Sequence, residues 1–411
     1  MSAVAVTAVW LDDLTDARVR EWLMGPADDP ELGGWLGAYQ GWLQALQQAQ
    51  QFGPLPRDDA RRQAAAAAEA AARTHWHAVL DATLQEVWNA AMAPLAAALA
   101  NSSISQSPNP SISNLQSPLT LIPTGLLGLL PLHAAWRADP AAASGRRYFL
   151  DDYVVRYAPS ATALGHAAQT AATAAAERLL AIDEPAVAGA GRLPNSAREV
   201  AAVAGHFTAP TLLAHAAATR TAVLARLADA QVVHFSCHGA NNWGDPLASG
   251  LLMAGGDLLT VADVLELRLG GARLATLSAC ETGIPGASLP DEAVMLPSAL
   301  LQAGYAGVAA SLWTVSDIST AMLMAYFYKL WRDDGIEPPA ALVLAQRWLR
   351  DSSNGEKQAF FAGYAPELAG ELKMGMAVAV EFFVAVRKQG LVEERSFAAP
   401  FHWAAFYYTG A

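Results

Sequence analysis

The sequence predicts an α/β/α sandwich, in which a mostly parallel sheet is covered by helices on both faces. From residue 179 onward, short apolar segments of strand length alternate with longer segments whose apolar positions recur every three or four residues. The segments at 179–183, 231–236 and 273–278 each contain consecutive apolar residues, which is typical of strands buried on both faces. The chain has 411 residues, 53% of them hydrophobic, so it can form a large core and two or three domains.

The first hundred residues are predicted to be mainly helical. We expect a short strand at 4–10 and helices at 14–24 and 36–50, and an alanine-rich run at 64–69 leads into an amphipathic helix at 75–99. Residues 101–118 are rich in Ser, Asn and Pro and carry no charge, so we interpret them as a surface insertion within one domain. A strand is expected to resume at 119–123.

The second part of the chain carries the alternating pattern. After the strand at 179–183 we expect helices at 196–206 and 219–230, a strand at 231–236 and a hairpin around 255–256. A helix at 261–267, a strand at 273–278, a helix at 291–303 and a strand at 307–312 follow. Further helices are predicted at 318–331 and 339–350, and a packed strand is predicted within 401–408.

Charge and cysteine content exclude several classes of function. The formal net charge is −12, from 26 Lys and Arg against 38 Asp and Glu, which disfavours binding to nucleic acids or to an anionic membrane surface. No basic, apolar leader or long uncharged apolar stretch is present, so we expect a cytoplasmic protein. Two cysteines are too few for a disulfide framework or a cysteine-rich zinc module, and no cofactor is indicated. The two cysteines still allow one reactive, catalytic thiol.

The candidate catalytic residues follow the ends of two predicted strands. One predicted strand runs into Cys237, His238 and Gly239, and another runs into Cys280. Because reactive groups gather at the carboxyl ends of parallel strands, neighbouring strands would bring His238 and Cys280 together as a base and a thiol nucleophile. The backbone N–H groups of Gly239 and Cys280 could then form an oxyanion hole. The alternative is that Cys280 is an inert buried thiol, as many cysteines are.

The residues beside this pair are given structural roles. Adjacent side chains on a strand point to opposite faces, so Cys237 should face the core when His238 faces the cleft. His234 is interpreted as a hydrogen-bonded core histidine. A zinc site made by His234, Cys237 and His238 is disfavoured, because one strand cannot direct all three side chains at one ion.

Several motifs together resemble a known family. They are LIPTGLL at 121–127, LPLHAA at 130–135, YAPS at 157–160, Leu193-Pro194 with Glu199, HFSCHG at 234–239, LSACETG at 277–283, SLWTVSD at 311–317, AQRWL at 345–349 and WAAF at 403–406. In this combination the chain resembles the CHAT domain, a caspase- and separase-like cysteine peptidase domain of bacteria that often follows tetratricopeptide repeats. The resemblance is strong from about residue 119 to residue 411.

The resemblance implies roles for individual residues. His238 would be the general base and acid, Cys280 the nucleophile, and Gly239 with Cys280 the source of the oxyanion hole. Residues 310–313, which include Ser311 and Trp313, would form the strand to which a substrate peptide adds. Asp317 would line the pocket for the P1 residue, the one before the scissile bond, and favour Arg or Lys there. The competing interpretation is that Ser316 or Asp317 caps the helix that begins near residue 318.

The resemblance also implies the organisation and function of the chain. Residues 1–170 would form a degenerate, non-catalytic caspase-like half, and residues 171–411 the catalytic half. The predicted function is a regulated cysteine endopeptidase that cleaves protein substrates in a bacterial stress, immunity or cell-death pathway. A sensor or repeat-containing protein would be its regulatory partner. The alternative is a catalytically silent interaction or signalling module with the same fold.

Overall fold

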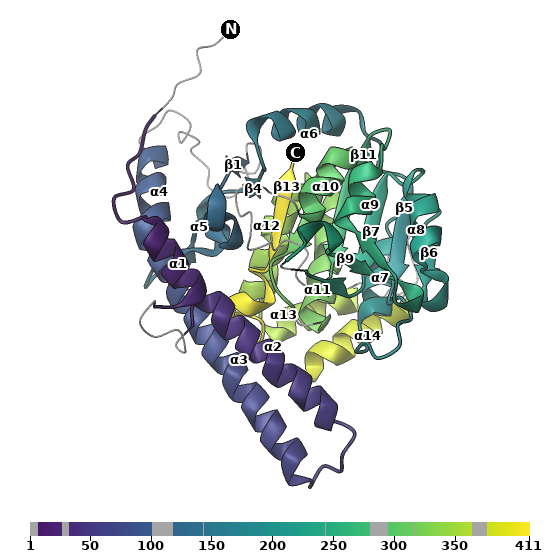
Figure 1. Cartoon of the computed structure of the whole chain (residues 1–411), viewed down its shortest axis with the longest axis horizontal. Coiled ribbons are helices and arrows are strands. Elements are labelled where there is room, and N and C mark those ends of the chain that lie inside the picture. Colours follow the sequence, from purple (N-terminus) through teal and green to yellow (C-terminus); the bar gives the residue numbers. More distant parts are fainter. Residues whose placement is uncertain are drawn as a thin grey trace. The chain divides into compact units, whose positions relative to one another are not determined.

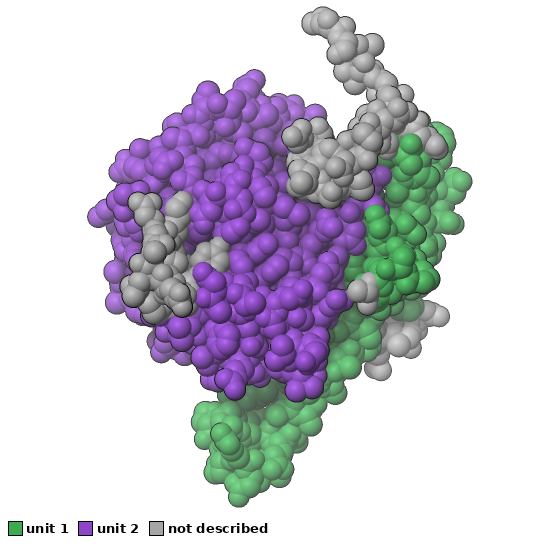
Figure 2. Space-filling view, turned by 180° about the vertical axis from the view of Figure 1, so that it is seen from behind, with its two compact units in different colours: residues 1–110, 132–149 green, residues 111–131, 150–411 purple. Residues whose placement is uncertain are grey.

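A computed structural model describes residues 7–26, 33–100, 118–142, 144–242, 244–279, 295–315, 317–363 and 376–411. The chain divides into two compact units (Figure 2). The first comprises residues 1–110 and 132–149, and the second comprises residues 111–131 and 150–411.

The first unit is mainly helical. Its helices are α1 (Asp16–Met24), α2 (Trp35–Phe52), α3 (Ala60–Val87) and α4 (Ala93–Ala100), with a π-helical turn at Trp88–Met92. Helices α2 and α3 pack against each other along their length (Figure 1), and Trp42 stacks on Trp76 with ring centroids 5.0 Å apart. Strands β2 (Trp136–Ala138) and β3 (Arg146–Tyr148) form an antiparallel pair. The described residues of this unit contain no further sheet. The predicted degenerate caspase-like half, residues 1–170, covers more of the chain than this unit and stays a prediction.

The second unit is built on an eight-stranded sheet. The strands in spatial order are β1 (Leu119–Leu121), β4 (Val155–Tyr157), β13 (Phe406–Gly410), β12 (Tyr305–Ser311), β11 (Ala272–Ser278), β7 (Val232–Ser236), β5 (Leu179–Asp183) and β6 (Thr211–Ala214). Neighbours are parallel except for β12 and β13. Every residue of β5, β7, β11, β12 and β13 is buried, as the continuous apolar runs predict.

Two groups of helices flank this sheet (Figure 1). In one group, α11 (Asp317–Tyr328) contacts both α7 (Ser196–Ala204) and α12 (Pro338–Asp351). In the other, α10 (Leu296–Ala303) contacts both α6 (Ala161–Thr173) and α9 (Val261–Glu266). The remaining helices are α5 (Phe149–Asp152), α8 (Arg220–Leu227), α13 (Asn354–Gly363) and α14 (Met376–Arg387). The predicted α/β/α sandwich with a mostly parallel sheet is confirmed.

A small antiparallel sheet follows β7. It contains β8 (Gly239–Ala240), β9 (Gly250–Leu252) and β10 (Leu258–Thr260). The turn between β9 and β10 contains Gly255 and Gly256, both with φ near +90°, a conformation that side chains with a Cβ disfavour. The hairpin predicted there is confirmed.

Several predicted boundaries differ from the structure. The strand expected at 4–10 has no regular structure at 7–10, and its first residues lie outside the described ranges, as does most of the predicted insertion at 101–118. The last strand begins at Phe406, after a short 3-10 turn at Pro400–His402. At the last change from one unit to the other, residue 149 belongs to the first unit and residue 150 to the second, and β4 and α6 belong to the large sheet and its covering helices. The predicted division into two halves at residue 170 stays a prediction.

Candidate active site

Strands β7 and β11 are parallel neighbours and end at the same edge of the sheet. Their register pairs Ser236 with Ser278, and the N–H of Cys237 donates to the carbonyl of Ser278 at 3.3 Å. His238 and Cys280 each follow one of these paired serines by two residues. The adjacency expected of the two strands is therefore present. Cys280 itself lies outside the described residues, so the predicted His238–Cys280 pair stays a prediction.

His238 is half-buried and held on both its backbone and its ring. The N–H of Leu252 donates to its carbonyl at 2.9 Å, and Gly239 begins β8, opposite Leu251 in β9. Its ring Nε2 lies 2.8 Å from the carbonyl oxygen of Gly191. A carbonyl oxygen only accepts, so Nε2 must carry the hydrogen of this bond. In the neutral ring the lone pair is then on Nδ1, which is the nitrogen available to act as a base.

The loop that supplies the Gly191 carbonyl borders a pocket. The pocket has a volume of about 490 Å³ and is lined by residues 184–188, 190–192 and His215. Among its lining groups are the carboxylate of Glu184, the guanidinium of Arg192 and the imidazole of His215. Because Gly191 both lines this pocket and binds the ring of His238, the pocket lies next to the predicted base.

The N-terminal end of α7 connects this edge of the sheet to several other elements. The hydroxyl of Ser196 donates to Oδ1 of Asp183 at 2.6 Å, and both residues are buried. Oε1 of Glu199 lies 2.9 Å from Nε2 of His234, and both of these residues are also buried. The prediction that His234 is a hydrogen-bonded core histidine is confirmed.

Asp317 is the first residue of α11, so this helix begins one residue before the position expected. Its Oδ2 accepts the backbone N–H of Asn195 at 2.7 Å and the side-chain amide of Asn195 at 2.6 Å. Burial raises the pKa of Asp317, and the two hydrogen bonds from Asn195 offset part of that effect. The structure thus places a half-buried carboxylate at this edge, oriented by a residue 122 positions away. It leaves both interpretations of Asp317, as a substrate-binding acid and as a helix-terminal residue, as predictions.

Ser311 and Trp313 are fully buried. The hydroxyl of Ser311 donates to the carbonyl of Ala279 at 2.6 Å, and the indole of Trp313 donates to the carbonyl of Phe401 at 3.2 Å. Ser311 therefore ties the end of β12 to the residue before Cys280. Their predicted contact with a substrate stays a prediction.

Residues 310–313, the predicted strand for peptide addition, are partly paired within the sheet. Peptide addition requires a strand edge with unpaired backbone groups. Ala310 and Ser311 pair with Tyr407 and Phe406 of β13, whereas the pairing of β12 with β11 on the other side runs only as far as Ala309. The N–H of Leu312 also donates to Ala405. Peptide addition at residues 310–313 stays a prediction, and any free backbone groups for it would have to lie on the side of Ala310 and Ser311 that faces away from β13 or beyond Leu312.

Glu184, Asn195 and Ser196 also belong to this edge, although their sequence positions did not predict it. The available signals were an acidic residue at the end of a buried strand and an Asn-Ser pair before a helix, and both are common. Cys237 is buried, as predicted. Within the ranges that the structure describes, no group of three or more His, Cys, Asp or Glu side chains could hold a metal ion.

The fold and this edge define a class of protein: an α/β sandwich whose predicted nucleophile and base follow adjacent parallel strands. The family model of the CHAT domain matches residues 81–411, and the chain belongs to this family. No curated protein is similar enough in sequence to count as a match. None of the helices in the described ranges is long and apolar enough to cross a membrane.

Two solved structures are similar at low identity. One is the Arg-specific cysteine proteinase gingipain R, at 11% identity and a TM-score of 0.34, covering 62% of this chain and 53% of that one. The other is the complex of Porphyromonas gingivalis RgpB pro- and mature domains, at 11% identity and a TM-score of 0.35, covering 62% and 54%. The chain thus spans about half the length of each solved chain.

Proposed function

We propose that this chain is a cysteine endopeptidase that uses Cys280 as nucleophile and His238 as base. The observation that carries the proposal is the register of β7 and β11, which makes Ser236 and Ser278 direct neighbours two residues before His238 and Cys280. Membership of the CHAT domain family supports the same assignment. The orientation of the histidine supports it further, because Nε2 is bound to Gly191 and Nδ1 is left for the thiol.

The proposed reaction has two stages. Nδ1 of His238 takes the proton of the Cys280 thiol, and the thiolate attacks the peptide carbonyl. The N–H groups of Gly239 and Cys280 stabilise the oxyanion of the tetrahedral intermediate. The imidazolium then gives its proton to the leaving amine, and a thioester remains on Cys280. In the second stage water, deprotonated by Nδ1, attacks the thioester and releases the carboxyl product and the free thiol.

A basic P1 residue is the proposed substrate preference. The carboxylate of Asp317 is half-buried and oriented by Asn195, so a guanidinium or ammonium group placed against it would form a partly desolvated, charge-assisted hydrogen bond. The net charge of −12 supports the same preference, because it favours the approach of basic peptide segments.

The two cysteines provide a matched test of the nucleophile. Turnover of a broad peptide library should fall by at least about a thousandfold in Cys280→Ala. Cys237→Ser should keep near wild-type turnover, because that residue is buried in the core. A thiol reagent should modify Cys280 in the folded protein and Cys237 only after unfolding. If wild type and Cys280→Ala are equally inactive, with and without candidate partners, the proposed endopeptidase activity is wrong and a catalytically silent interaction module is favoured.

The P1 preference is tested by profiling the cleaved bonds. Wild type should cleave after Arg or Lys, and Asp317→Asn should lose most of that preference. Asp229→Asn is the control, since Asp229 is an exposed acid that precedes β7. A preference for Leu or Met at P1, or an unchanged profile in Asp317→Asn, would overturn the basic-pocket assignment.

The biological setting follows from the family and belongs to the same proposal. We propose regulation by a sensor or repeat-containing partner in a bacterial, cytoplasmic stress, immunity or cell-death pathway. Wild type and Cys280→Ala are incubated with a lysate of the host, and new protein N-termini are sequenced. Termini that appear only with wild type would identify the substrates, and no difference between the two would contradict endopeptidase activity under those conditions.

A further inference from the structure

The loop between β5 and α7 holds the ring of His238 although most of the loop is exposed. Residues 186–194 run over the surface, and Gly191 and Arg192 are both exposed. The carbonyl of Gly191 nevertheless accepts a 2.8 Å hydrogen bond from the ring. An exposed loop can fix a ring in one orientation only if the loop itself is fixed. The described contacts show what fixes it.

Glu184, the residue that follows β5, closes this loop with its side chain. Its Oε1 accepts the backbone N–H of Leu193 and Nε of Arg192, both at 2.8 Å, and its Oε2 accepts Nη2 of Arg192 at 3.3 Å. Gly191 lies next to the two residues that are held. The side chain of Glu184 is only 12% exposed, against 83% for Arg192, so the carboxylate is the covered and fixed partner.

The charge of Glu184 suits this role. Burial alone would raise the pKa of this carboxyl, but the hydrogen bonds from Leu193 and Arg192 more than offset it, and the pKa is lowered. The anion is therefore the form that binds both ends of the contact. Charge-assisted hydrogen bonds of this kind are stronger than neutral ones.

The backbone of Glu184 is strained in a way that supports the same role. Its φ is +36°, and His215, at φ +50°, is the only other non-glycine residue with positive φ in the described part of the chain. The ring Nδ1 of His215 lies 3.1 Å from the carbonyl of Glu184, so the two strained residues hold each other. A left-handed backbone favours glycine, and other residues keep it where the surroundings over-determine it. Here the side chain that glycine lacks is the one that closes the loop.

We infer that Glu184 is a positioning residue for His238. It fixes Leu193 and Arg192, these fix the carbonyl of Gly191, and that carbonyl keeps the hydrogen on Nε2 and the lone pair on Nδ1. The inference rests on the proposed role of His238 as the base. Glu184 makes no described contact with the ring itself and acts through the loop.

The test uses two readouts, one of which does not depend on activity. In protein labelled with ¹⁵N-histidine, and assigned with a His238→Gln variant, the Nε2 hydrogen of His238 should give a slowly exchanging NMR signal. Glu184→Ala should lose that protection, whereas Glu184→Gln should retain it, because the amide oxygen can still accept from Leu193 and Arg192. Glu177→Ala, which removes a 77% exposed glutamate before β5, is the control and should leave the signal unchanged.

Activity gives the second readout. In Glu184→Ala, kcat should fall by about a hundredfold with KM nearly unchanged, as expected for a misplaced base, and Glu184→Gln should recover most of the loss. Arg192→Ala keeps the hydrogen bond from Leu193 to Glu184 and removes a side chain that is 83% exposed. Its kcat should lie between those of Glu184→Gln and Glu184→Ala. A protected Nε2 hydrogen in Glu184→Ala would overturn the inference, as would equal loss of kcat in the Gln and Ala variants. An inactive wild type would instead count against the proposed function, while the NMR signal would still test the contact.

Discussion

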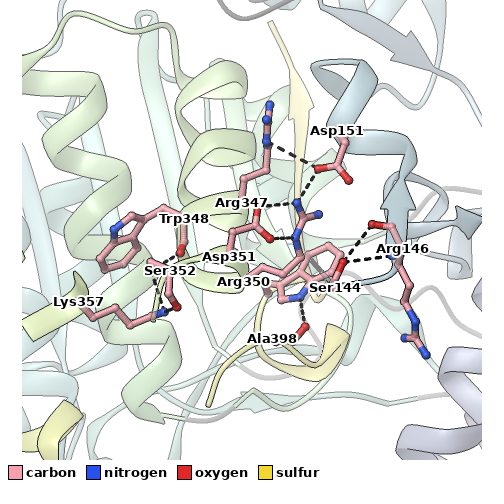
Figure 3. A network of polar contacts seen from close by, with 11 residues as sticks. Ser144, Arg146, Asp151, Arg347, Trp348, Arg350, Asp351, Ser352, Lys357 and Ala398 are labelled. Carbon is pink, nitrogen blue, oxygen red and sulfur yellow. Dashed lines mark hydrogen bonds and ion pairs between the residues drawn. The ribbon is translucent and has the colours of Figure 1, made fainter. Parts of the chain in front are cut away.

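Lys357 offers a measurable consequence of burying a charge. Its side chain is fully buried, and Nζ donates to the carbonyl of Ser352 at 2.6 Å and to its hydroxyl at 2.8 Å (Figure 3). Nζ also lies 5.6 Å from the ring centroid of Trp348 and 5.5 Å from that of Phe397. All of these partners are neutral. Burial is the main reason that the pKa of Lys357 is lowered from 10.5 to about 8, and the nearby charges change it less.

The lowered pKa fixes the sign of a pH effect on stability. Below pH 8 the ammonium is charged in both the folded and the unfolded chain, so the folded state carries the cost of desolvating it. Between pH 8 and pH 10.5 the unfolded chain binds a proton that the folded chain has released, so the free energy of unfolding rises with pH. A pKa lowered from 10.5 to about 8 corresponds to a gain of about 3 kcal/mol across this window.

The measurement compares Lys357→Met with wild type by denaturant unfolding at steps from pH 7.5 to 10.5. Because other groups titrate in the same range, the quantity that matters is the difference in unfolding free energy between the two proteins. We expect wild type to gain about 3 kcal/mol relative to Lys357→Met as the pH rises. Lys388→Met, which removes an exposed lysine, should show no such trend. A difference that stays constant with pH in Lys357→Met would refute the reasoning.

Three further predictions concern the edge that carries the site. Ser311→Ala removes the buried donor to the residue before the predicted nucleophile and should lower the unfolding free energy by about 1–3 kcal/mol; an unchanged denaturation midpoint would contradict it. Glu199→Leu leaves Nε2 of His234 without its acceptor. In denaturant unfolding, the double variant with His234→Leu should lose less unfolding free energy than the sum of the losses in the two single variants. Asn195→Ala removes a side-chain hydrogen bond that lowers the pKa of Asp317, so the pKa of Asp317 should rise. As the pH is lowered, cleavage after basic residues should therefore begin to decline at a higher pH than in wild type; an unshifted acidic limb of the pH profile would argue against this.

The elements that sequence patterns predict well here are those whose pattern is local and strong. Strands β5, β7 and β11 contain consecutive apolar residues, and the helices between them favour a parallel arrangement. Helix α14 shows the opposite case. It contains four valines and two phenylalanines, which favour a strand, yet Phe382 stacks on Phe361 of α13 at 4.5 Å within a pair of packed helices. Tertiary packing overrides the local preference, and a single sequence does not contain that contact.

The site divides in the same way. His238 and Cys280 could be proposed because each follows the end of a predicted strand, and strand ends are visible in the sequence. The residues that contact Asp317 and His238 cannot be identified in this way, because the contacts join positions far apart in the sequence. Asp317 binds a residue 122 positions away, and the ring of His238 binds the carbonyl of a residue 47 positions away. A backbone carbonyl carries no sequence signal at all, so no residue type at Gly191 could have indicated its role.

The first turn of α7 links these separate contacts into one unit. Asn195 binds α11, Ser196 binds the end of β5, Arg198 binds Glu381 of α14, and Glu199 binds β7. The ion pair of Arg198 is solvent-exposed and contributes little, whereas Ser196 and Glu199 are buried and their bonds are costly to break. Because β5 leads into the loop that holds His238 and β7 ends two residues before it, both supports of the proposed base are fixed by this one turn. Among the described contacts, the position of the proposed base is thus set by buried polar contacts at the ends of β5 and β7 and by the loop whose Gly191 carbonyl binds its ring.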